Sequence, residues 1–178
     1  PYPDARSMRG DILGSEGLLD QAVVDYREAI RAANEAAEEF PDRAERQCRY
    51  ANFQMAATVE VEEKYTEIIE AVNEYMDFYG DKANISKGIF WIGKTLLKQK
   101  RVDEAITRYL DAIAQYGHDL EQDGVDSMIS ELVGNVLRQL NKGQRASLLS
   151  RSNELLQNAE DMTLSLRLRA MIAAINED

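Results

Sequence analysis

The sequence predicts an all-α fold made of stacked helix pairs, and three observations indicate it. An aromatic residue followed by a turn recurs at near-constant spacing, since Tyr2, Phe40, Tyr79 and Tyr116 lie 38, 39 and 37 residues apart. Such a period is typical of repeated units that bury their apolar faces against one another. Pro and Gly are scarce, with three and ten among 178 residues. Long stretches rich in Ala, Glu, Leu and Arg also favour helix.

The clearest helix pair lies in residues 88–117. Apolar residues recur there at helical spacing in two stretches, separated by a polar turn at residues 98–101. Gly93 and Ala105 would lie on facing helices, where small side chains let two backbones approach closely. The apolar positions are Ile89, Ile92, Leu96 and Leu97, then Ala105, Ile106, Tyr109, Ile113 and Tyr116.

This pattern resembles the tetratricopeptide repeat, whose two helices follow the spacing W-x2-LG-x2-Y and then A-x3-F, A and P. Ile stands here in place of the first Trp, and Gly in place of the final Pro. The resemblance implies antiparallel helix pairs that stack into a right-handed α-α superhelix. The matching positions are Ile89, Ile92, Gly93, Leu96, Ala105, Tyr109, Ala112 and Gly117.

The resemblance extends over nearly the whole chain. It implies a single solenoid domain, residues 1–178, of about four helix pairs with a C-terminal capping helix. The second helix of the first pair is expected to continue to Phe40. HEAT-like pairs have a similar period and are the structural alternative, but the small-residue spacing of Gly93 and Ala105 favours the tetratricopeptide form. That spacing recurs at Gly10 and Ala22 and at Gly134 and Ala146. The expected units are residues 1–41, 42–80, 81–118 and 119–160, with the cap at 161–178.

Repeats of about 38 residues with Tyr/Phe-Pro-Asp between them are similar to those of bacterial envelope proteins. Outer-membrane assembly lipoproteins and periplasmic cell-division coordinators are examples. This narrower resemblance favours the bacterial periplasm or cell envelope, with the cytoplasm as the alternative.

Charge and composition restrict the partners. The net charge of −11 argues against nucleic acid or an anionic membrane as the main partner, because phosphate groups are bound by basic surfaces. The longest apolar runs are far shorter than a membrane span. One Cys and one His permit neither an internal disulfide nor a Cys/His metal cluster. We therefore expect no metal, no cofactor and no direct membrane insertion.

The sequence contains no recognisable catalytic constellation, and we expect the protein not to be an enzyme. His118 lies in a turn without a nucleophile to activate. Cys48 is flanked by arginines, which would lower its pKa if it were exposed, but a packed thiol is the simpler interpretation. The many carboxylates lie along helix faces and in turns, which is the distribution expected of solvated surface residues.

The tetratricopeptide resemblance implies that the first helix of each pair lines a concave groove. When the groove positions of the family are transferred to this sequence by register, they give a strip of cationic residues beside aromatic anchors. We expect it to bind a peptide or protein that carries acidic residues next to an apolar anchor. The alternative is that these lysines only solubilise the surface and the phenylalanines belong to the core. The Lys and Asn pattern of chaperone-tail-binding members is not reproduced. The groove residues are Tyr50, Phe53, Lys87, Phe90, Lys94, Lys98, Asn135 and Arg138.

The function that follows is a non-catalytic protein-interaction scaffold. The alternative is a structural or self-associating spacer within a larger protein. The oligomeric state and the identity of the partner stay open.

Overall fold

The computed structural model of the chain describes residues 3–60, 65–80, 83–120 and 122–177. The chain is 86% helical, and the described residues contain no strand, so the all-α prediction is confirmed. The helices are α1 (Pro3–Ser15), α2 (Leu19–Glu35), α3 (Pro41–Glu60), α4 (Tyr65–Tyr79), α5 (Ile85–Lys98), α6 (Val102–Tyr116), α7 (Gly124–Glu131), a π-helical segment (Leu132–Val136), a 3₁₀ turn (Leu137–Gln139), α8 (Lys142–Asn158) and α9 (Met162–Glu177).

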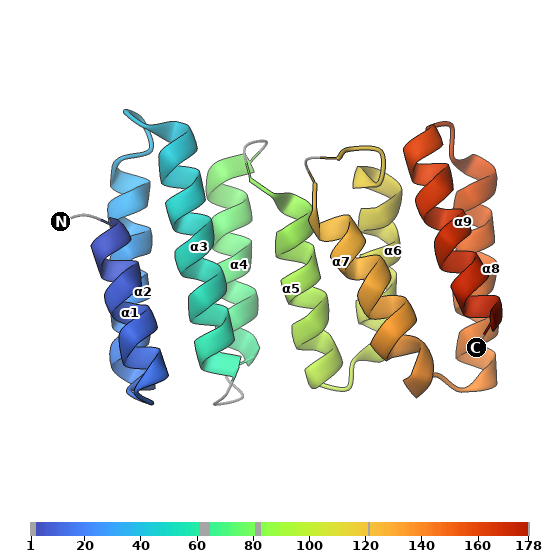
Figure 1. The fold of residues 1–178 in the computed structure, drawn as a ribbon, viewed down its shortest axis with the longest axis horizontal. Helices are drawn as coiled ribbons and strands as arrows, with labels where there is room; N and C mark the ends of the chain where they lie inside the picture. The colour runs from blue at the N-terminus through green and yellow to red at the C-terminus, as the bar shows by residue number, and fades with distance from the viewer. Residues whose placement is uncertain (1–2, 61–64, 81–82, 121, 178) are drawn as a thin grey trace. The chain divides into compact units, whose positions relative to one another are not determined.

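The chain forms two compact units, Pro1–Ala83 with α1 to α4 and Asn84–Asp178 with α5 to α9. Within each unit, consecutive helices run antiparallel (Figure 1). In the first unit, α1 and α3 form one layer and α2 and α4 the other. In the second unit, α5, α7 and α9 form one layer and α6 and α8 the other.

The turns that close α1–α2 and α5–α6 share one geometry. Gly17 and Lys100 both have positive φ, at 78° and 64°. The residue after each donates its backbone N–H to a carbonyl five positions back, a Schellman-type helix end. The polar turn predicted at residues 98–101 is thus confirmed. The two hydrogen bonds, each 2.9 Å long, run from Leu18 to Leu13 and from Arg101 to Leu96.

The aromatic period marks helix ends less uniformly than expected. Tyr79 and Tyr116 are the last residues of α4 and α6, whereas Tyr2 lies outside the described residues. The expected extension of the second helix to Phe40 is wrong, because α2 ends at Glu35. Glu35 is the last residue of α2, and Glu38 and Glu39 follow after two alanines; the helix dipole disfavours such negative charge at a C-terminus. Pro41 then starts α3, at the position where a missing N–H costs nothing.

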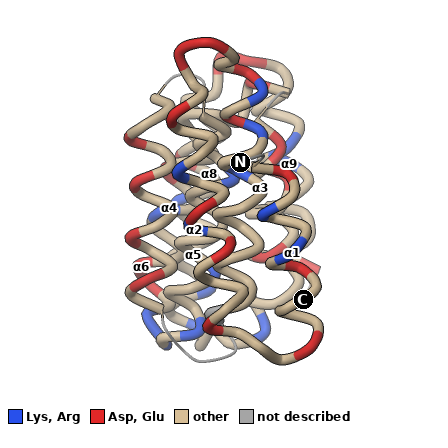
Figure 2. Tube along the Cα trace, turned by 90° about the vertical axis from the view of Figure 1, so that its left-hand side faces the viewer, with Lys and Arg blue, Asp and Glu red and all other residues tan. Residues whose placement is uncertain are grey.

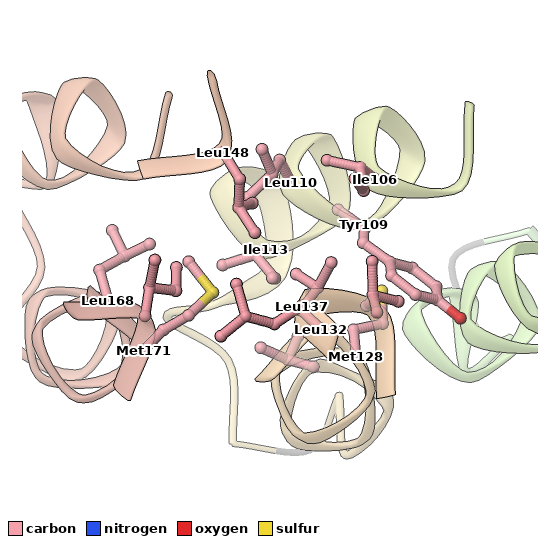
Figure 3. Close-up of a cluster of buried hydrophobic side chains, with 14 of the residues drawn as sticks. Ile106, Tyr109, Leu110, Ile113, Met128, Leu132, Leu137, Leu148, Leu168 and Met171 are labelled. Carbon is pink, nitrogen blue, oxygen red and sulfur yellow. The ribbon is translucent and has the colours of Figure 1, made fainter. Parts of the chain in front are cut away.

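The core of the second unit consists mainly of large aliphatic side chains, together with Tyr109, Met128 and Met171 (Figure 3). It is filled by α6, α7 with its π-helical continuation, α8 and α9. Leu110 and Ile113 of α6 meet Leu148 of α8, and all three are at most 1% exposed. This cluster closes the space between α6 and α8.

The core of the first unit is richer in alanine than that of the second and contains two buried carboxylates, beside large side chains such as Tyr26. Its buried alanines come from α2 and α3 and allow these helices to pack closely. Asp25 is only 1% exposed and accepts hydrogen bonds from Arg6 and Arg9 of α1. Tyr75, also buried, donates a 2.5 Å hydrogen bond to Glu45. The alanines are Ala22, Ala29, Ala33, Ala44, Ala51 and Ala56.

The expected equivalence of Gly134 with Gly93 is wrong. A Cβ on Gly93 would meet the ring of Tyr109, whereas a Cβ on Gly134 would have nothing within 4 Å. Ala146 is exposed, whereas Ala105 is fully buried. The π-helical segment explains the difference, because it changes the helical register in the middle of this helix.

The expected closing helix is present as α9. Its inner side is buried through Leu164, Leu168, Met171 and Ile175. Its outer side carries Met162 and Leu166, which are 77% and 59% exposed. A capping helix has a polar outer side, and α9 departs from that expectation.

Candidate partner-binding face

The starts of α5 and α7 are held together by polar contacts. The Asn84 side chain caps α5 by accepting from the Lys87 N–H, and its amide donates to Asp123 at 2.8 Å. The Gly124 N–H, at the start of α7, donates to the Ser86 hydroxyl at 3.0 Å. A Cβ on Gly124 would lie 2.3 Å from the Ser86 backbone, so only glycine permits this approach. These contacts place α5 and α7 side by side.

Phe90 lies on the side of α5 that faces α7. Its ring stacks on Tyr109 of α6, with centroids 6.3 Å apart and planes 17° from parallel. The Tyr109 hydroxyl donates to the Phe90 carbonyl at 3.1 Å. Phe90 is half-buried and packs against the core cluster. It therefore combines the two roles weighed for it, since part of the ring supports the core and part stays accessible.

Two lysines of α5 lie over aromatic rings. The Lys87 ammonium is 5.8 Å from the Phe90 centroid and 3.8 Å from Asp123. The Lys94 ammonium is 4.8 Å from the Trp91 centroid, a cation–π distance. Trp91, on α5, is not among the residues that the sequence places in the groove. These contacts hold the ammonium groups of Lys87 and Lys94 close to the surface of α5.

An open hollow of about 450 Å³ lies between α5 and α7. Its floor is Phe90, and its wall on α7 and the π-helical segment is polar. Arg167 of α9 pairs with Asp126 at 2.9 Å, and Asn135 donates to Glu131 at 2.8 Å, so both acids in the wall already have partners. The wall residues are Asp126, Ser127, Ser130, Glu131 and Asn135.

The structure brings part of the predicted groove together. Phe90 and Asn135 line the hollow, and Lys87 and Lys94 flank Phe90 on α5. Lys98 and Arg138 are exposed, at the end of α5 and in the 3₁₀ turn. Tyr50 and Phe53 belong to α3 in the other unit. The sequence did not predict Asp126, Ser127 and Ser130, because the family's register selects positions along only one side of the helix.

Tyr50 and Phe53 have contacts of their own. The Tyr50 hydroxyl donates to Asp11 at 2.7 Å, and the Tyr50 side chain remains 46% exposed. Phe53 packs edge-on against Tyr75, with centroids 5.9 Å apart. Asp11 also accepts from the buried Tyr26, so it joins α1, α2 and α3. Tyr50 thus presents an accessible ring on α3, and Phe53 contributes to packing.

Charged residues of both signs occur on helices of both units, as Figure 2 shows.

The two residues considered as candidate catalytic groups are His118 and Cys48, and among the residues that the structure describes neither lies beside groups that would activate it. His118 is exposed in its turn. Cys48 is 1% exposed, and burial raises the pKa of its thiol to about 12. Within the described ranges, no group of three or more His, Cys, Asp or Glu could hold a metal ion. None of the described helices is long and apolar enough to cross a membrane.

No family model, no curated protein and no solved structure matches the chain.

Proposed function

We infer that this protein is a non-catalytic scaffold that binds a partner peptide or protein through the α5–α7 face. The observation that carries the proposal is the open hollow floored by Phe90, with Lys87 and Lys94 held over aromatic rings beside it. An accessible aromatic floor next to positioned cations suits a ligand with an apolar side chain and adjacent carboxylates.

The helix pairs support a tetratricopeptide-like superhelix as the architecture of this scaffold. In both α1–α2 and α5–α6, a glycine of the first helix faces a tyrosine of the second, Gly10 with Tyr26 and Gly93 with Tyr109. A repeat protein is expected to show the same contact between helices and the same turn geometry in each pair, as these two pairs do. In such a superhelix the α5–α7 face belongs to the concave side.

The charge balance of the face supports an acidic ligand. Asp126 pairs with Arg167 of α9, and Glu131 accepts a hydrogen bond from Asn135, so their charges are partly satisfied. Arg138 is exposed and forms no ion pair with any residue in the described ranges. A protein with net charge −11 repels acidic ligands at long range, so such a local cationic area determines where they can dock.

The test is selection of binding peptides on the full chain from a random display library. Enriched peptides are expected to carry Asp or Glu next to Phe, Leu or Ile. Affinity of the best peptide is then measured by fluorescence anisotropy. The Lys87→Glu/Lys94→Glu variant is expected to weaken binding at least about tenfold. Ser130→Trp, which fills the hollow from the exposed side of α7, is expected to do the same.

The matched control is Arg108→Glu/Lys142→Glu, which makes the same change of net charge at exposed sites on α6 and α8. It should leave the affinity within about twofold. Equal loss in the control would show that net charge decides binding. Unchanged binding by Ser130→Trp would exclude the hollow.

The exposed side of α9 favours self-association as a second candidate function. Met162 and Leu166 lie one helical turn apart and are 77% and 59% exposed. Such an apolar stripe is typical of a helix that packs on another surface. If it forms a dimer contact, Met162→Lys/Leu166→Lys will lower the mass measured by light scattering at high concentration. A concentration-independent monomer for the wild-type chain would exclude this function.

A further inference from the structure

A cavity of about 590 Å³ opens between α2 and α4 in the first unit, with α3 as its floor. The second helices of the two pairs form its walls, so it lies in the layer opposite α1 and α3 (Figure 1). Its volume lies within the range of small-molecule sites. The apolar part of its lining comes from Ile30, Cys48, Met55, Ala71 and Tyr75.

At this cavity, a charged residue stands where the second unit has a leucine. Tyr26 and Tyr109 hold equivalent places in their helix pairs, so Arg27 of α2 corresponds to Leu110 of α6. Leu110 is buried against α8, whereas the Arg27 side chain is 60% exposed. On α4 the facing residues are glutamates. α2 and α4 therefore pack on α3 far more extensively than on each other.

The mouth of the cavity has an excess of negative charge. Two arginines and four glutamates surround it. Arg27 pairs with Glu67 across the mouth at 3.1 Å, and Arg31 pairs with Glu28 and Glu35 on its own helix. Glu70 and Glu74, exposed and one turn apart on α4, form no ion pair with any residue in the described ranges. The arginines are Arg27 and Arg31, and the glutamates are Glu35, Glu67, Glu70 and Glu74.

The floor offers a further acceptor. Asn52 lines the cavity and is 2% exposed. Its amide nitrogen donates to the carbonyl and the sulfur of Cys48, at 3.1 and 3.3 Å. Its Oδ1 accepts no hydrogen bond from the residues that the structure describes. Every fully buried side-chain nitrogen and oxygen atom of the described residues has a hydrogen-bond partner, so this Oδ1 is accessible from the cavity and is within reach of a ligand that donates a hydrogen bond.

We propose that this cavity binds a low-molecular-weight organic cation, an amine or guanidine with an apolar body. The apolar body lies on Met55, Ile30 and Tyr75, and the cationic group pairs with Glu70 and Glu74. Arg27 and Arg31 each pair with a glutamate and Tyr75 donates to Glu45, whereas Glu70 and Glu74 form no ion pair with any residue in the described ranges. The lining therefore selects a ligand that donates, and it disfavours anions. The site is independent of the α5–α7 face.

The test compares three probes of similar shape on the full ¹⁵N-labelled chain. They are 2-phenylethylamine, neutral 2-phenylethanol and anionic 3-phenylpropanoate. The amine is expected to bind most tightly and to shift the backbone amides of Ile30, Asn52 and Ala71. Equal binding of all three probes, or shifts confined to other residues, would overturn the proposal.

The variant Glu70→Gln/Glu74→Gln is expected to weaken binding of the amine about five- to tenfold and to leave the alcohol unaffected. Glu38→Gln/Glu39→Gln is the matched control, since it removes two exposed charges of the same unit that do not line the cavity. Equal weakening in the control would overturn the proposal, because general acidity would then explain the binding. A pentalysine peptide that binds where 2-phenylethylamine does not would also overturn it, in favour of a basic protein partner.

Discussion

A Cβ atom on Gly93 would lie 2.1 Å from Cε1 of Tyr109, so the tyrosine ring occupies the space that any larger residue at position 93 would need. The same relationship holds between Gly10 and Tyr26, where the distance would be 2.7 Å. In both pairs the ring of the second helix lies directly on the backbone of the first. Burial raises the pKa of both tyrosines above the ordinary value.

Gly93→Ala is expected to destabilise the protein by about 1–3 kcal/mol, because the ring of Tyr109 or the helix must move. Gly134→Ala is the matched control, since a Cβ there meets nothing within 4 Å. That change is expected to be neutral or to stabilise by up to about 1 kcal/mol through helix propensity. Urea unfolding followed by circular dichroism measures both. Equal effects of the two substitutions would contradict the close contact at Gly93.

Lys100→Gly is expected to raise the free energy of unfolding by about 0.5–1 kcal/mol. Lys100 has φ +64°, a left-handed conformation that costs energy for any residue with a Cβ. The equivalent turn residue is Gly17, and Gly17→Ala is expected to lower stability by about 1 kcal/mol. Thermal unfolding of the two variants gives opposite shifts in Tm if the turns are alike. A lower Tm for Lys100→Gly would contradict this.

Asp25→Asn is expected to destabilise the protein by about 2 kcal/mol at about pH 7, because a charged hydrogen-bond acceptor is lost. Hydrogen bonding to Arg9, then charge attraction from Arg9 and Arg6, holds the pKa of Asp25 below its ordinary value. A lowered folded-state pKa contributes stability above the unfolded pKa of about 3.9, and that stability is lost as pH falls through the folded pKa. The difference between wild type and variant should therefore shrink as the pH falls below about 3.9. A difference that stays constant with pH would exclude the ionised Asp25 as its source.

Cys48 is expected to react with a thiol reagent at least about 100-fold more slowly in the folded protein than an exposed cysteine does. Only the thiolate reacts, and burial raises the pKa of Cys48 to about 12. The exposed reference is Ser150→Cys in a Cys48→Ala background. Absorbance of the released thiolate follows both reactions, and denaturant should make their rates equal. Comparable rates without denaturant would show that Cys48 is accessible.

The helix content and the first pair of each unit could be predicted because local periodicity determines them. Gly93, Ala105 and Tyr109 follow the spacing that two facing helices require, and the structure has them in contact or buried. The fourth pair could not be predicted in detail. Sequence spacing assumes a constant helical register, and the π-helical segment before Leu137 breaks it.

The candidate face was only partly predictable. Phe90 and Lys94 follow from the register of α5. The pairing of Asp126 with Arg167 depends on where α9 packs, which no local pattern contains. The cavity of the first unit was not predicted for a related reason. From the sequence alone, Glu70 and Glu74 are ordinary solvated residues; only the packing of α2 and α4 on α3 places them at a cavity.

The contrast between the two cores has a consequence for the order of unfolding. Because the first core contains alanines and a buried Tyr75–Glu45 pair, we expect it to be stabilised less by apolar burial than the leucine-rich cluster around Leu110. Amide protons of α2 and α3 should therefore exchange with deuterium faster than those of α6, through partial opening of the first unit alone. A ligand in the α2–α4 cavity would slow exchange in the first unit and leave the second unchanged. Hydrogen exchange can thus distinguish ligand binding in the cavity from partner binding on the α5–α7 face.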